Sequence, residues 1–363
     1  MEGVFGRARH DDEPLLIPVL TQKGRGGKAA EENPAFFHGV GPMTKIDAPA
    51  EKAGGEDSWS GVMARALCAA AERDPKVMAG TAAMKDGTKL DAFAKRYPQR
   101  FFDTGIEEEH MLVYAAGLAA AGMRPAVCIY STFLQRAMDQ VMHDICLPKL
   151  PVLLGIDRAG LVGEDGETHH GILDVSWLRA VPNMTLAAPR DAVDLEFFVE
   201  EWRRRGIPAA IRYPRGKVPL SLARETGAVP AEWGKCEVMR EGSEICLIGV
   251  GSTVPLMLEA ADEISKRGTA PTVVDLRFIK PLDIEGLLPV LASHKTIVTA
   301  EENALAGGVG EEIAALMKER GIAASCACAG VPDRFIAHAT RAQQWEECGL
   351  TVENIMKLCG AEK

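Results

Sequence analysis

From residue 57 onward, short and almost continuously apolar runs alternate with longer runs that have helical periodicity. Four of these apolar runs come before residue 217, at Ala126–Tyr130, Pro151–Ile156, Met184–Ala188 and Ala209–Tyr213. Strands of this composition are buried on both faces, which is typical of parallel sheets. Parallel strands need crossover connections, and the intervening helical runs supply them. The sequence therefore predicts βαβ units and an α/β sheet that helices cover on both sides.

A second block repeats this alternation after a polar connection from Gly216 to about Trp233. The apolar runs in it predict strands at Ile245–Val250, Thr272–Leu276, Thr296–Thr299 and Ala324–Cys328. Helices are expected near Pro255–Arg267, Gly308–Arg320 and Thr351–Leu358. A chain of 363 residues is long enough for two cores of ordinary size. We therefore predict two α/β domains, at residues 57–217 and 218–363.

Residues 1–56 lack the alternation, and Gly and Pro recur through the segments Gln22–Lys28 and Glu31–Pro42. This pattern indicates an extended linker. The one strand-like run in this part is Leu15–Thr21. A lone strand is unstable in water, so we expect it to join a sheet that is supplied from elsewhere.

Charge and cysteine content exclude several classes of partner. The net charge is −10 and no Lys/Arg-rich run occurs, which argues against nucleic acid or an anionic membrane as partner. No apolar run is long enough to span a bilayer, and the first residues contain no signal-peptide pattern. The nine cysteines are scattered, and the close pair Cys326-Ala-Cys328 lacks a second ligand pair for zinc. We expect reduced thiols in a cytoplasmic protein.

The stretch from Asp103 to His110 joins a β-like run, Arg100–Phe102, to a helix-like run, Met111–Gly122. Three consecutive glutamates, at positions 107 to 109, stand at the predicted helix start, where the helix dipole favours negative charge. Thr104 and Glu107 have the spacing of a capping box. Carboxylates at such positions mostly face water, so solvent exposure is the default expectation for each of the three.

Four further polar segments stand at or just after the ends of predicted strands, or in the loop that follows one of them. They are Tyr130-Ser-Thr-Phe133-Leu-Gln-Arg136, Asp157-Arg158-Ala-Gly160, Asp165-Gly-Glu-Thr-His169-His-Gly171 and Tyr213-Pro-Arg215-Gly216. Ligands of α/β sheets collect at the carboxyl ends of the strands. The planar fork of arginine suits phosphate oxygens. Taken singly, each residue also fits an ordinary structural position, such as a surface arginine, a core aromatic or a loop histidine.

Taken together with Asp103–His110, these segments resemble the pyrimidine-binding domain of the transketolase-like thiamine-diphosphate enzymes, and most of all the 1-deoxy-D-xylulose-5-phosphate synthase family. Two segments of the second block, Asp275–Asp283 and Glu301–Gly308, also match that family and mark the block as its C-terminal domain. The resemblance implies two doubly wound α/β domains, preceded by a remnant of the diphosphate-binding domain at residues 1–56. It covers the whole chain but only the later part of the family's length. The family's Gly-Asp-Gly motif followed by Asn, which binds diphosphate and Mg²⁺, has no counterpart in this sequence.

The resemblance also implies roles for individual residues. Catalytic roles fall to Glu108, His169 and His38, with Glu108 as the acid that activates the coenzyme. Binding of thiamine diphosphate falls to Glu108, Tyr130, Phe133, Arg136 and Lys23. Binding of substrate falls to Arg158, Arg215, Asp165 and Tyr130, with the two arginines on the phosphate of glyceraldehyde 3-phosphate. No metal ligand is assigned to this chain.

The implied reaction condenses pyruvate with glyceraldehyde 3-phosphate to 1-deoxy-D-xylulose 5-phosphate and CO₂, for isoprenoid and thiamine precursor synthesis. We expect a homodimeric core, and we expect a separate N-terminal chain to supply the diphosphate and Mg²⁺ site. By itself this polypeptide would then be inactive. One alternative is another enzyme of the superfamily, either a transketolase half or the β subunit of a 2-oxo acid dehydrogenase. The other alternative is a non-catalytic truncated or regulatory subunit.

Overall fold

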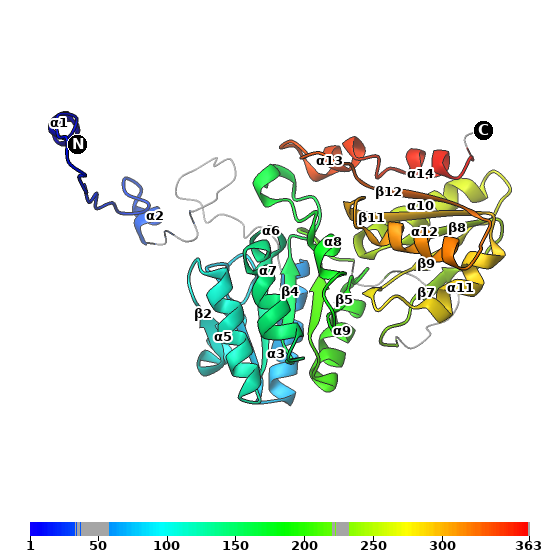
Figure 1. Cartoon of the computed structure of the whole chain (residues 1–363), viewed down its shortest axis with the longest axis horizontal. Coiled ribbons are helices and arrows are strands. Elements are labelled where there is room, and N and C mark those ends of the chain that lie inside the picture. Colours follow the sequence, from blue (N-terminus) through cyan, green and yellow to red (C-terminus); the bar gives the residue numbers. More distant parts are fainter. Residues whose placement is uncertain (33, 35–36, 38–57, 220–221, 223–231, 362–363) are drawn as a thin grey trace. The chain divides into compact units, whose positions relative to one another are not determined.

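The computed structural model describes residues 1–32, 34, 37, 58–219, 222 and 232–361 (Figure 1). The chain divides into two compact units, residues 1–53 and 54–363. The first unit contains the helices α1 (Glu2–Ala8) and α2 (Lys28–Glu32). The strand expected at Leu15–Thr21 is absent, and the side chains of Leu16 and Leu20 are 89% and 99% exposed. In the described chain this run has no neighbouring strand to pair its backbone groups, so its pairing with a sheet supplied from elsewhere stays a prediction.

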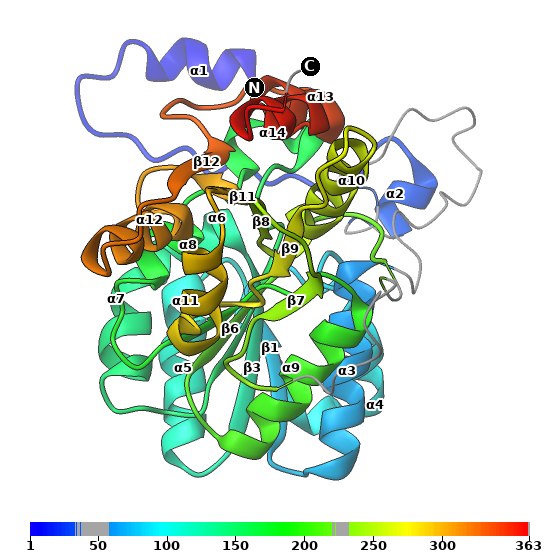
Figure 2. The same cartoon turned by 90° about the vertical axis from the view of Figure 1, so that its right-hand side faces the viewer.

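The second unit contains a seven-stranded sheet in the order β10-β5-β6-β4-β3-β1-β2 (Figure 2). Its strands are β1 (Val77–Thr81), β2 (Phe101–Asp103), β3 (Arg124–Tyr130), β4 (Leu153–Asp157), β5 (Thr185–Ala187), β6 (Ala209–Arg212) and β10 (Phe278–Lys280). All neighbouring pairs are parallel except β10 with β5. The edge strand β10 comes from the second block of the sequence, so the two blocks share this sheet.

Helices cover both faces of the seven-stranded sheet, as the apolar runs predicted. One face packs against α3 (Trp59–Arg73), α4 (Asp91–Arg96) and α9 (Ala192–Arg205), and the other against α5 (Glu108–Ala120), the π-helical segment η4 (Val141–Cys146) and α8 (Asp174–Leu178). Side chains of β3 alternate between the two faces: Ala126 and Cys128 belong to the first cluster, and Val127 and Ile129 to the second. Short helical segments, α6 (Ser131–Leu134), η3 (Gln135–Ala137) and α7 (Met138–Gln140), follow β3.

The second sheet has five strands in the order β12-β11-β8-β9-β7. They are β7 (Glu237–Arg240), β8 (Ile245–Gly249), β9 (Thr272–Asp275), β11 (Thr296–Ala304) and β12 (Ser325–Val331). Only β7 is antiparallel to its neighbour. The helices of this part are α10 (Val254–Ser265), α11 (Ile284–Ser293), α12 (Val309–Glu319), α13 (Arg341–Glu347) and α14 (Val352–Leu358). Side chains of α10 and α14 pack on one face, and those of α11 and α12 on the other.

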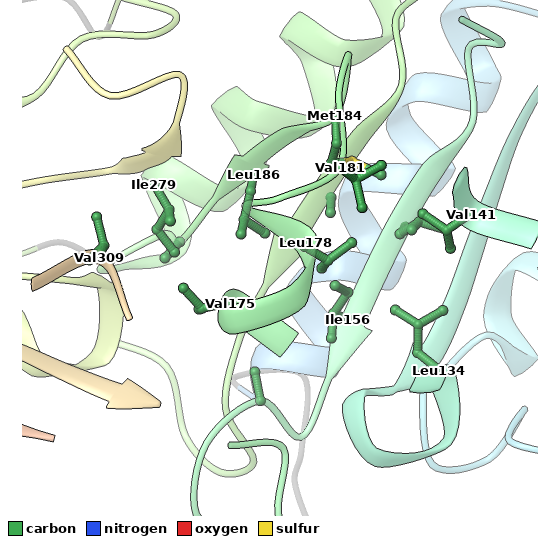
Figure 3. Close-up of a cluster of buried hydrophobic side chains, with 14 of the residues drawn as sticks. Leu134, Val141, Ile156, Val175, Leu178, Val181, Met184, Leu186, Ile279 and Val309 are labelled. Carbon is green, nitrogen blue, oxygen red and sulfur yellow. The ribbon is translucent and has the colours of Figure 1, made fainter. Parts of the chain in front are cut away.

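One apolar core runs from the first sheet into the second part of the unit. Figure 3 shows Leu178 of α8 and Leu186 of β5 close to Ile279 of β10, with Val309 of α12 farther along the same cluster. These side chains are fully buried or nearly so. Because the core is continuous, the two sheets pack as one body rather than as two domains joined only by a linker.

Buried ion pairs reinforce the same junction. The guanidinium of Arg190 is fully buried and donates to carboxylate oxygens of Asp275 and Glu237, at 2.7 and 2.8 Å. Arg277 donates to Asp194 at 2.7 Å. These pairs connect α9 and the end of β5 with β7 and β9. Removing one member of such a pair leaves a buried charge without its partner, which makes the junction sensitive to substitution.

The predicted fold class is confirmed: the second unit consists of two mixed α/β sheets covered by helices. All eight strands predicted from the apolar runs of the two blocks are present, with ends that differ by a few residues. The short strands β7 and β10 were not predicted. No helix in the described residues is long and apolar enough to cross a membrane.

Candidate active site

The predicted site residues gather at the carboxyl edge of the seven-stranded sheet. Strand β3 ends at Tyr130 and β4 ends at Asp157, and these two residues lie side by side in the parallel register. Strand β2 ends at Asp103, and α5 begins five residues later at Glu108. Three strands therefore deliver polar and aromatic side chains to one edge, as expected for a ligand site of a parallel sheet.

Only the central one of the three consecutive glutamates is buried. The Glu108 residue is 3% exposed, whereas Glu107 and Glu109 are exposed. Glu108 is the first residue of α5, and its Oε1 accepts a hydrogen bond from Nη1 of Arg136 at 3.2 Å. The carboxylate is thus held by one cation at a helix start, where the dipole also favours negative charge. The structure separates Glu108 from its neighbours, which the sequence pattern alone does not do.

The capping box predicted from Thr104 and Glu107 does not form. The residue that precedes the helix is Glu107 itself, and no side chain caps the free N–H groups. The hydroxyl of Thr104 instead donates to the backbone carbonyl of Glu107 at 3.4 Å. Since the helix begins later than the pattern suggested, the prediction was wrong by one turn.

Aromatic rings form a second layer beside Glu108. Tyr130 and Phe133 are stacked, with ring centroids 5.7 Å apart and planes tilted by 16°. The ring of His169 meets Phe133 edge-on at 5.4 Å. The guanidinium carbon of Arg136 lies 5.4 Å from the Phe133 ring centre. Because Phe133 is only half-buried, this layer presents an aromatic surface on which a planar ring can stack.

Arg158 follows β4 directly and is fixed from several sides. Its Nη1 donates to Asp157 Oδ1 at 2.8 Å, to the carbonyl of Gly87 at 2.9 Å and to Ser60 Oγ at 3.2 Å. Its guanidinium carbon also lies 4.1 Å from the centre of the Tyr130 ring. The Nε of Arg158 is buried and has no hydrogen-bond partner. A buried donor without a partner calls for an acceptor that the protein does not supply, and a bound anion would meet this need.

The absence of a side chain at Gly87 lets the hydroxyl group of Tyr130 lie close to the backbone there. A Cβ at that position would lie 1.8 Å from the hydroxyl oxygen of Tyr130. Any side chain there would displace Tyr130, and with it the surface on which Arg158 stacks.

Arg215 follows β6 and reaches the loop that carries Asp165 and His169. Its Nη1 donates to Asp165 Oδ2 at 2.6 Å and to the carbonyl of Val162 at 3.2 Å. Burial raises the pKa of the Tyr130 hydroxyl, while the charges of Arg158 and Arg215 oppose that rise. The carboxylates of Asp157 and Asp165 act in the same direction as burial, so Tyr130 lies within electrostatic reach of both arginines and of their acidic partners.

The loop between residues 159 and 171 is fastened by residues that the sequence did not single out for this purpose. Gly160 and Gly171 exchange both backbone hydrogen bonds, at 2.7 and 2.8 Å, and close the base of the loop. Inside it, the N–H of Val162 donates to Nδ1 of His170 at 3.2 Å, and Nε2 of His170 lies 3.0 Å from the carbonyl of Ile336. This geometry requires a neutral imidazole with its proton on Nε2. Burial accordingly lowers the pKa of His170.

The described structure leaves two predicted site residues untested. Lys23 lies in the first unit, exposed in a turn over residues 23–26. His38 lies outside the described residues. The remaining eight predicted residues stand on the carboxyl side of β2, β3, β4 and β6. Among the residues that the structure describes, no group of three or more His, Cys, Asp and Glu side chains is placed to hold a metal ion.

Two family profiles match the chain. The first, described as "Transketolase, pyrimidine binding domain", matches residues 56–221. The second, "Transketolase, C-terminal domain", matches residues 234–355. The site described above lies mainly within the first match, and Ile336, whose carbonyl contacts His170 of the loop, lies within the second.

Curated relatives carry the name 1-deoxy-D-xylulose-5-phosphate synthase. The protein of Desulfitobacterium hafniense is 46% identical over 89% of this chain and 51% of its own length. The protein of Desulforudis audaxviator is 43% identical over the full chain and 57% of its own length. The chain thus spans about half the length of the curated relatives that it matches.

Two solved structures that resemble the chain are titled transketolases. A structure titled "Split gene transketolase, inactive beta4 tetramer" superposes with a TM-score of 0.75 at 30% identity, covering 82% of this chain and 96% of that one. The transketolase of Campylobacter jejuni superposes with a TM-score of 0.70 over 85% of this chain and 47% of its own, and at 20% identity it shows the shared fold alone.

Proposed function

Because the chain belongs to the transketolase family of thiamine-diphosphate enzymes, we propose that it is the C-terminal section of a 1-deoxy-D-xylulose-5-phosphate synthase. The proposed reaction joins pyruvate and glyceraldehyde 3-phosphate to 1-deoxy-D-xylulose 5-phosphate with loss of CO₂. We divide the chain into a remnant and linker (1–56), a pyrimidine-binding domain (57–217) and a C-terminal domain (218–363). The nine cysteines are free, which fits a reducing, cytoplasmic compartment.

The observation that carries the proposal is the selective burial of Glu108 beside an aromatic surface. A carboxyl group that faces the pyrimidine ring of the coenzyme must be shielded from water and fixed in orientation. Glu108 meets both conditions, because it is buried at the start of α5 and held by Arg136. Phe133 stands next to Arg136 and offers the stacking surface for that ring.

When bound, thiamine diphosphate supplies the nucleophilic carbon of the reaction. The role proposed for Glu108 is to share a proton with a ring nitrogen of the pyrimidine. Arg136 keeps the carboxylate in place for this exchange, and Phe133 fixes the plane of the ring. His169, edge-on to Phe133, stands where a side chain could donate a hydrogen bond to the carboxylate of pyruvate.

The acceptor end of the site is proposed to lie between Arg158 and Arg215. Phosphate is best held by planar guanidinium groups that offer two parallel N–H donors. Arg158 has one edge of its fork free while the other is fixed by Asp157, Gly87 and Ser60. Arg215 is half-exposed and paired with Asp165, so a phosphate would compete with or bridge that pair. Tyr130, whose ring centre lies 4.1 Å from the guanidinium carbon of Arg158, is proposed to contribute to this substrate site as well.

The diphosphate and Mg²⁺ are proposed to be held by a polypeptide region outside this sequence, such as a separate N-terminal chain. Mg²⁺ prefers several oxygen ligands, and the described residues provide no such cluster. The neighbour with 30% identity is titled a split-gene transketolase in an inactive form, which supports an arrangement over two chains. Calorimetry with thiamine diphosphate and Mg²⁺ tests this idea: the chain alone should bind weakly and bind tightly once the diphosphate-binding chain is added. Tight magnesium-dependent binding by the chain alone would refute it.

A homodimeric core is proposed through the outer face of α5. That face exposes Val113 (47%), and the neighbouring Met142 and Leu147 are 41% and 68% exposed. Ala and Gly recur along the helix, which permits close packing against a second copy. Contiguous exposed apolar side chains of this kind mark association surfaces.

The whole proposal is tested by a donor assay on the assembled enzyme. Product should form from pyruvate and glyceraldehyde 3-phosphate, and a ketose phosphate should not replace pyruvate. Turnover with the ketose phosphate alone would favour a transketolase half. Absence of turnover with every donor, despite tight coenzyme binding, would favour a non-catalytic subunit.

A further inference from the structure

The second sheet carries a buried carboxylate that the proposed chemistry does not use. Glu302 lies in β11 and is fully buried. Its Oε1 accepts hydrogen bonds from the N–H of Leu161 at 2.8 Å, from Trp345 Nε1 at 2.9 Å and from Arg341 Nε at 3.2 Å. Its Oε2 accepts from Arg341 Nη2 at 2.6 Å and from Ser252 Oγ at 2.8 Å. Burial would raise the pKa of Glu302, but the guanidinium of Arg341 outweighs it and holds the pKa below its ordinary value.

Four of these donors belong to the C-terminal part of the chain, and the fifth belongs to the catalytic edge of the first sheet. Leu161 is the first residue after the closed base of the loop that carries Asp165 and His169. The backbone carbonyl of Glu302 also accepts a bond from Nη2 of Arg212, at 3.0 Å, in the strand that leads to Arg215. Glu302 therefore contacts both segments that frame the proposed acceptor site.

Consecutive backbone N–H groups of the loop all bond to side chains. Leu161 donates to Glu302, Val162 donates to His170, and Gly163 donates to Oε1 of Gln344 at 2.9 Å. Two of these three acceptors lie in the C-terminal domain. Such a series fixes the direction in which the loop leaves the sheet, because each N–H must point at a buried acceptor.

Gly160 shows how closely the two parts fit. It has a φ of +84°, and a Cβ on it would lie 2.4 Å from Cδ of Glu302. A side chain at this position would strain the backbone and also push the loop away from the carboxylate. The glycine of the Asp157-Arg-Ala-Gly160 segment is thus explained by contact with Glu302.

We propose that Glu302 is a positioning residue for the acceptor half of the active site. By fixing Leu161, it sets the loop so that Asp165 stands beside Arg215 and His169 stands against Phe133. Glu302 itself touches neither of the proposed coenzyme-binding groups Glu108 and Phe133, whose positions depend on α5 and α6. Loss of the carboxylate should therefore weaken use of the acceptor, and of pyruvate through His169, while coenzyme activation persists. The kinetic part of this inference rests on the proposed function.

The test compares Glu302→Gln with Glu301→Gln. Glu301 is an equally buried neighbour, but its carboxylate accepts from the N–H groups of Val309 and Gly310 at the start of α12. A third variant, Gly160→Ala, disturbs the same contact from the loop side without removing a charge. Hydrogen exchange by mass spectrometry over residues 161–171 reports the loop in the full chain without any substrate. In the assembled enzyme, the KM for glyceraldehyde 3-phosphate and the C2–H exchange of the coenzyme complete the comparison.

We expect Glu302→Gln and Gly160→Ala to speed exchange in the loop and to raise the KM for glyceraldehyde 3-phosphate about tenfold, since small misplacements of binding groups cost one to two orders of magnitude. Exchange of the coenzyme C2–H should stay within about twofold of the unaltered enzyme. Glu301→Gln should change neither the hydrogen exchange of the loop nor the KM for glyceraldehyde 3-phosphate.

Unchanged loop exchange in both Glu302→Gln and Gly160→Ala would overturn the inference, as would an equal effect of Glu301→Gln. If Glu302→Gln fails to fold, Gly160→Ala decides the outcome. An unaltered enzyme without product would refute the proposed function, while the loop exchange still decides the role of Glu302.

Discussion

Replacing Arg158 by lysine separates phosphate binding from structural support. The Nη1 of Arg158 serves three protein acceptors, in Asp157, Gly87 and Ser60, while Nε has none. A lysine ammonium carries three donors and one charge, so it can take over the contacts of Nη1. Lysine has no group that corresponds to the Nε–H donor of arginine. The substitution should therefore keep the buried Asp157 paired and remove only the two-bond contact with an anion.

The expected magnitude follows from these contacts. Losing a charge-assisted contact costs about 2–3 kcal/mol, which corresponds to a loss of about 30- to 160-fold in kcat/KM for the phosphorylated acceptor. Arg158→Ala serves as the contrasting variant, because it leaves Asp157, which is fully buried, without its cation. Breaking a buried pair in this way costs about 3–5 kcal/mol of stability. The alanine variant should thus lose stability as well as activity, and the lysine variant mainly activity.

The assay compares glyceraldehyde 3-phosphate with glyceraldehyde, which lacks the phosphate, as acceptors for the assembled enzyme. With glyceraldehyde, Arg158→Lys should match the unaltered enzyme within about threefold. Thermal unfolding of the chain checks that the lysine variant keeps its fold. An equal loss with both acceptors would show that Arg158 does not bind phosphate and that its role is to hold the loop after β4.

Three further outcomes are expected. Glu108→Ala should abolish C2–H exchange of the coenzyme, measured by NMR in deuterated buffer, while Glu107→Ala and Glu109→Ala retain it. If one of these two variants loses the exchange instead, the catalytic acid is that neighbouring glutamate and not Glu108. Burial lowers the pKa of His170 below the ordinary 6.5. As the pH drops from about 7 to about 5, the imidazole of His170 therefore takes up a proton more readily in the unfolded chain than in the folded chain. The melting temperature should fall over this range. His170→Gln should flatten this dependence relative to the unaltered chain, and an identical pH profile would rule out His170 as its source. Val113→Asp should shift the chain from dimer to monomer in sedimentation velocity, and an unchanged dimer would place the interface elsewhere than on α5.

The fold was predictable because its strongest signals are local. Runs such as Pro151–Ile156 are too short for helices and too apolar for exposed strands, so burial in a parallel sheet was the consistent solution. The edge at which Tyr130 and Arg158 meet followed from the same rule, since the carboxyl ends of parallel strands coincide. The choice of Glu108 among three glutamates came from the family resemblance, because its selective burial does not follow from the local sequence pattern. That burial depends on the residue at which α5 begins, and helix ends are poorly defined by pattern.

Contacts between distant residues explain what the sequence did not reveal. Glu302 bonds to Leu161 across 141 positions, and Gln344 bonds to Gly163 across 181. No spacing rule covers such pairs. A hint was present in β11, where two adjacent glutamates stand in a strand that is otherwise uncharged, and buried charges require partners. Leu15–Thr21 is a different case, because the strand predicted there needs a sheet from elsewhere and the described chain supplies no neighbour for it.

The position of strand β10 determines how this chain can be divided into fragments. It lies beyond the connection between the two sheets and yet forms the outer strand next to β5. A protease that cuts the connection between residues 219 and 232 should therefore yield a nicked molecule that stays assembled, not two separable domains. A recombinant fragment that ends at residue 217 would bare the edge of β5 and its unpaired backbone groups, an open template for aggregation. An exchange of the pyrimidine-binding domain between relatives would have to include the short segment Phe278–Lys280.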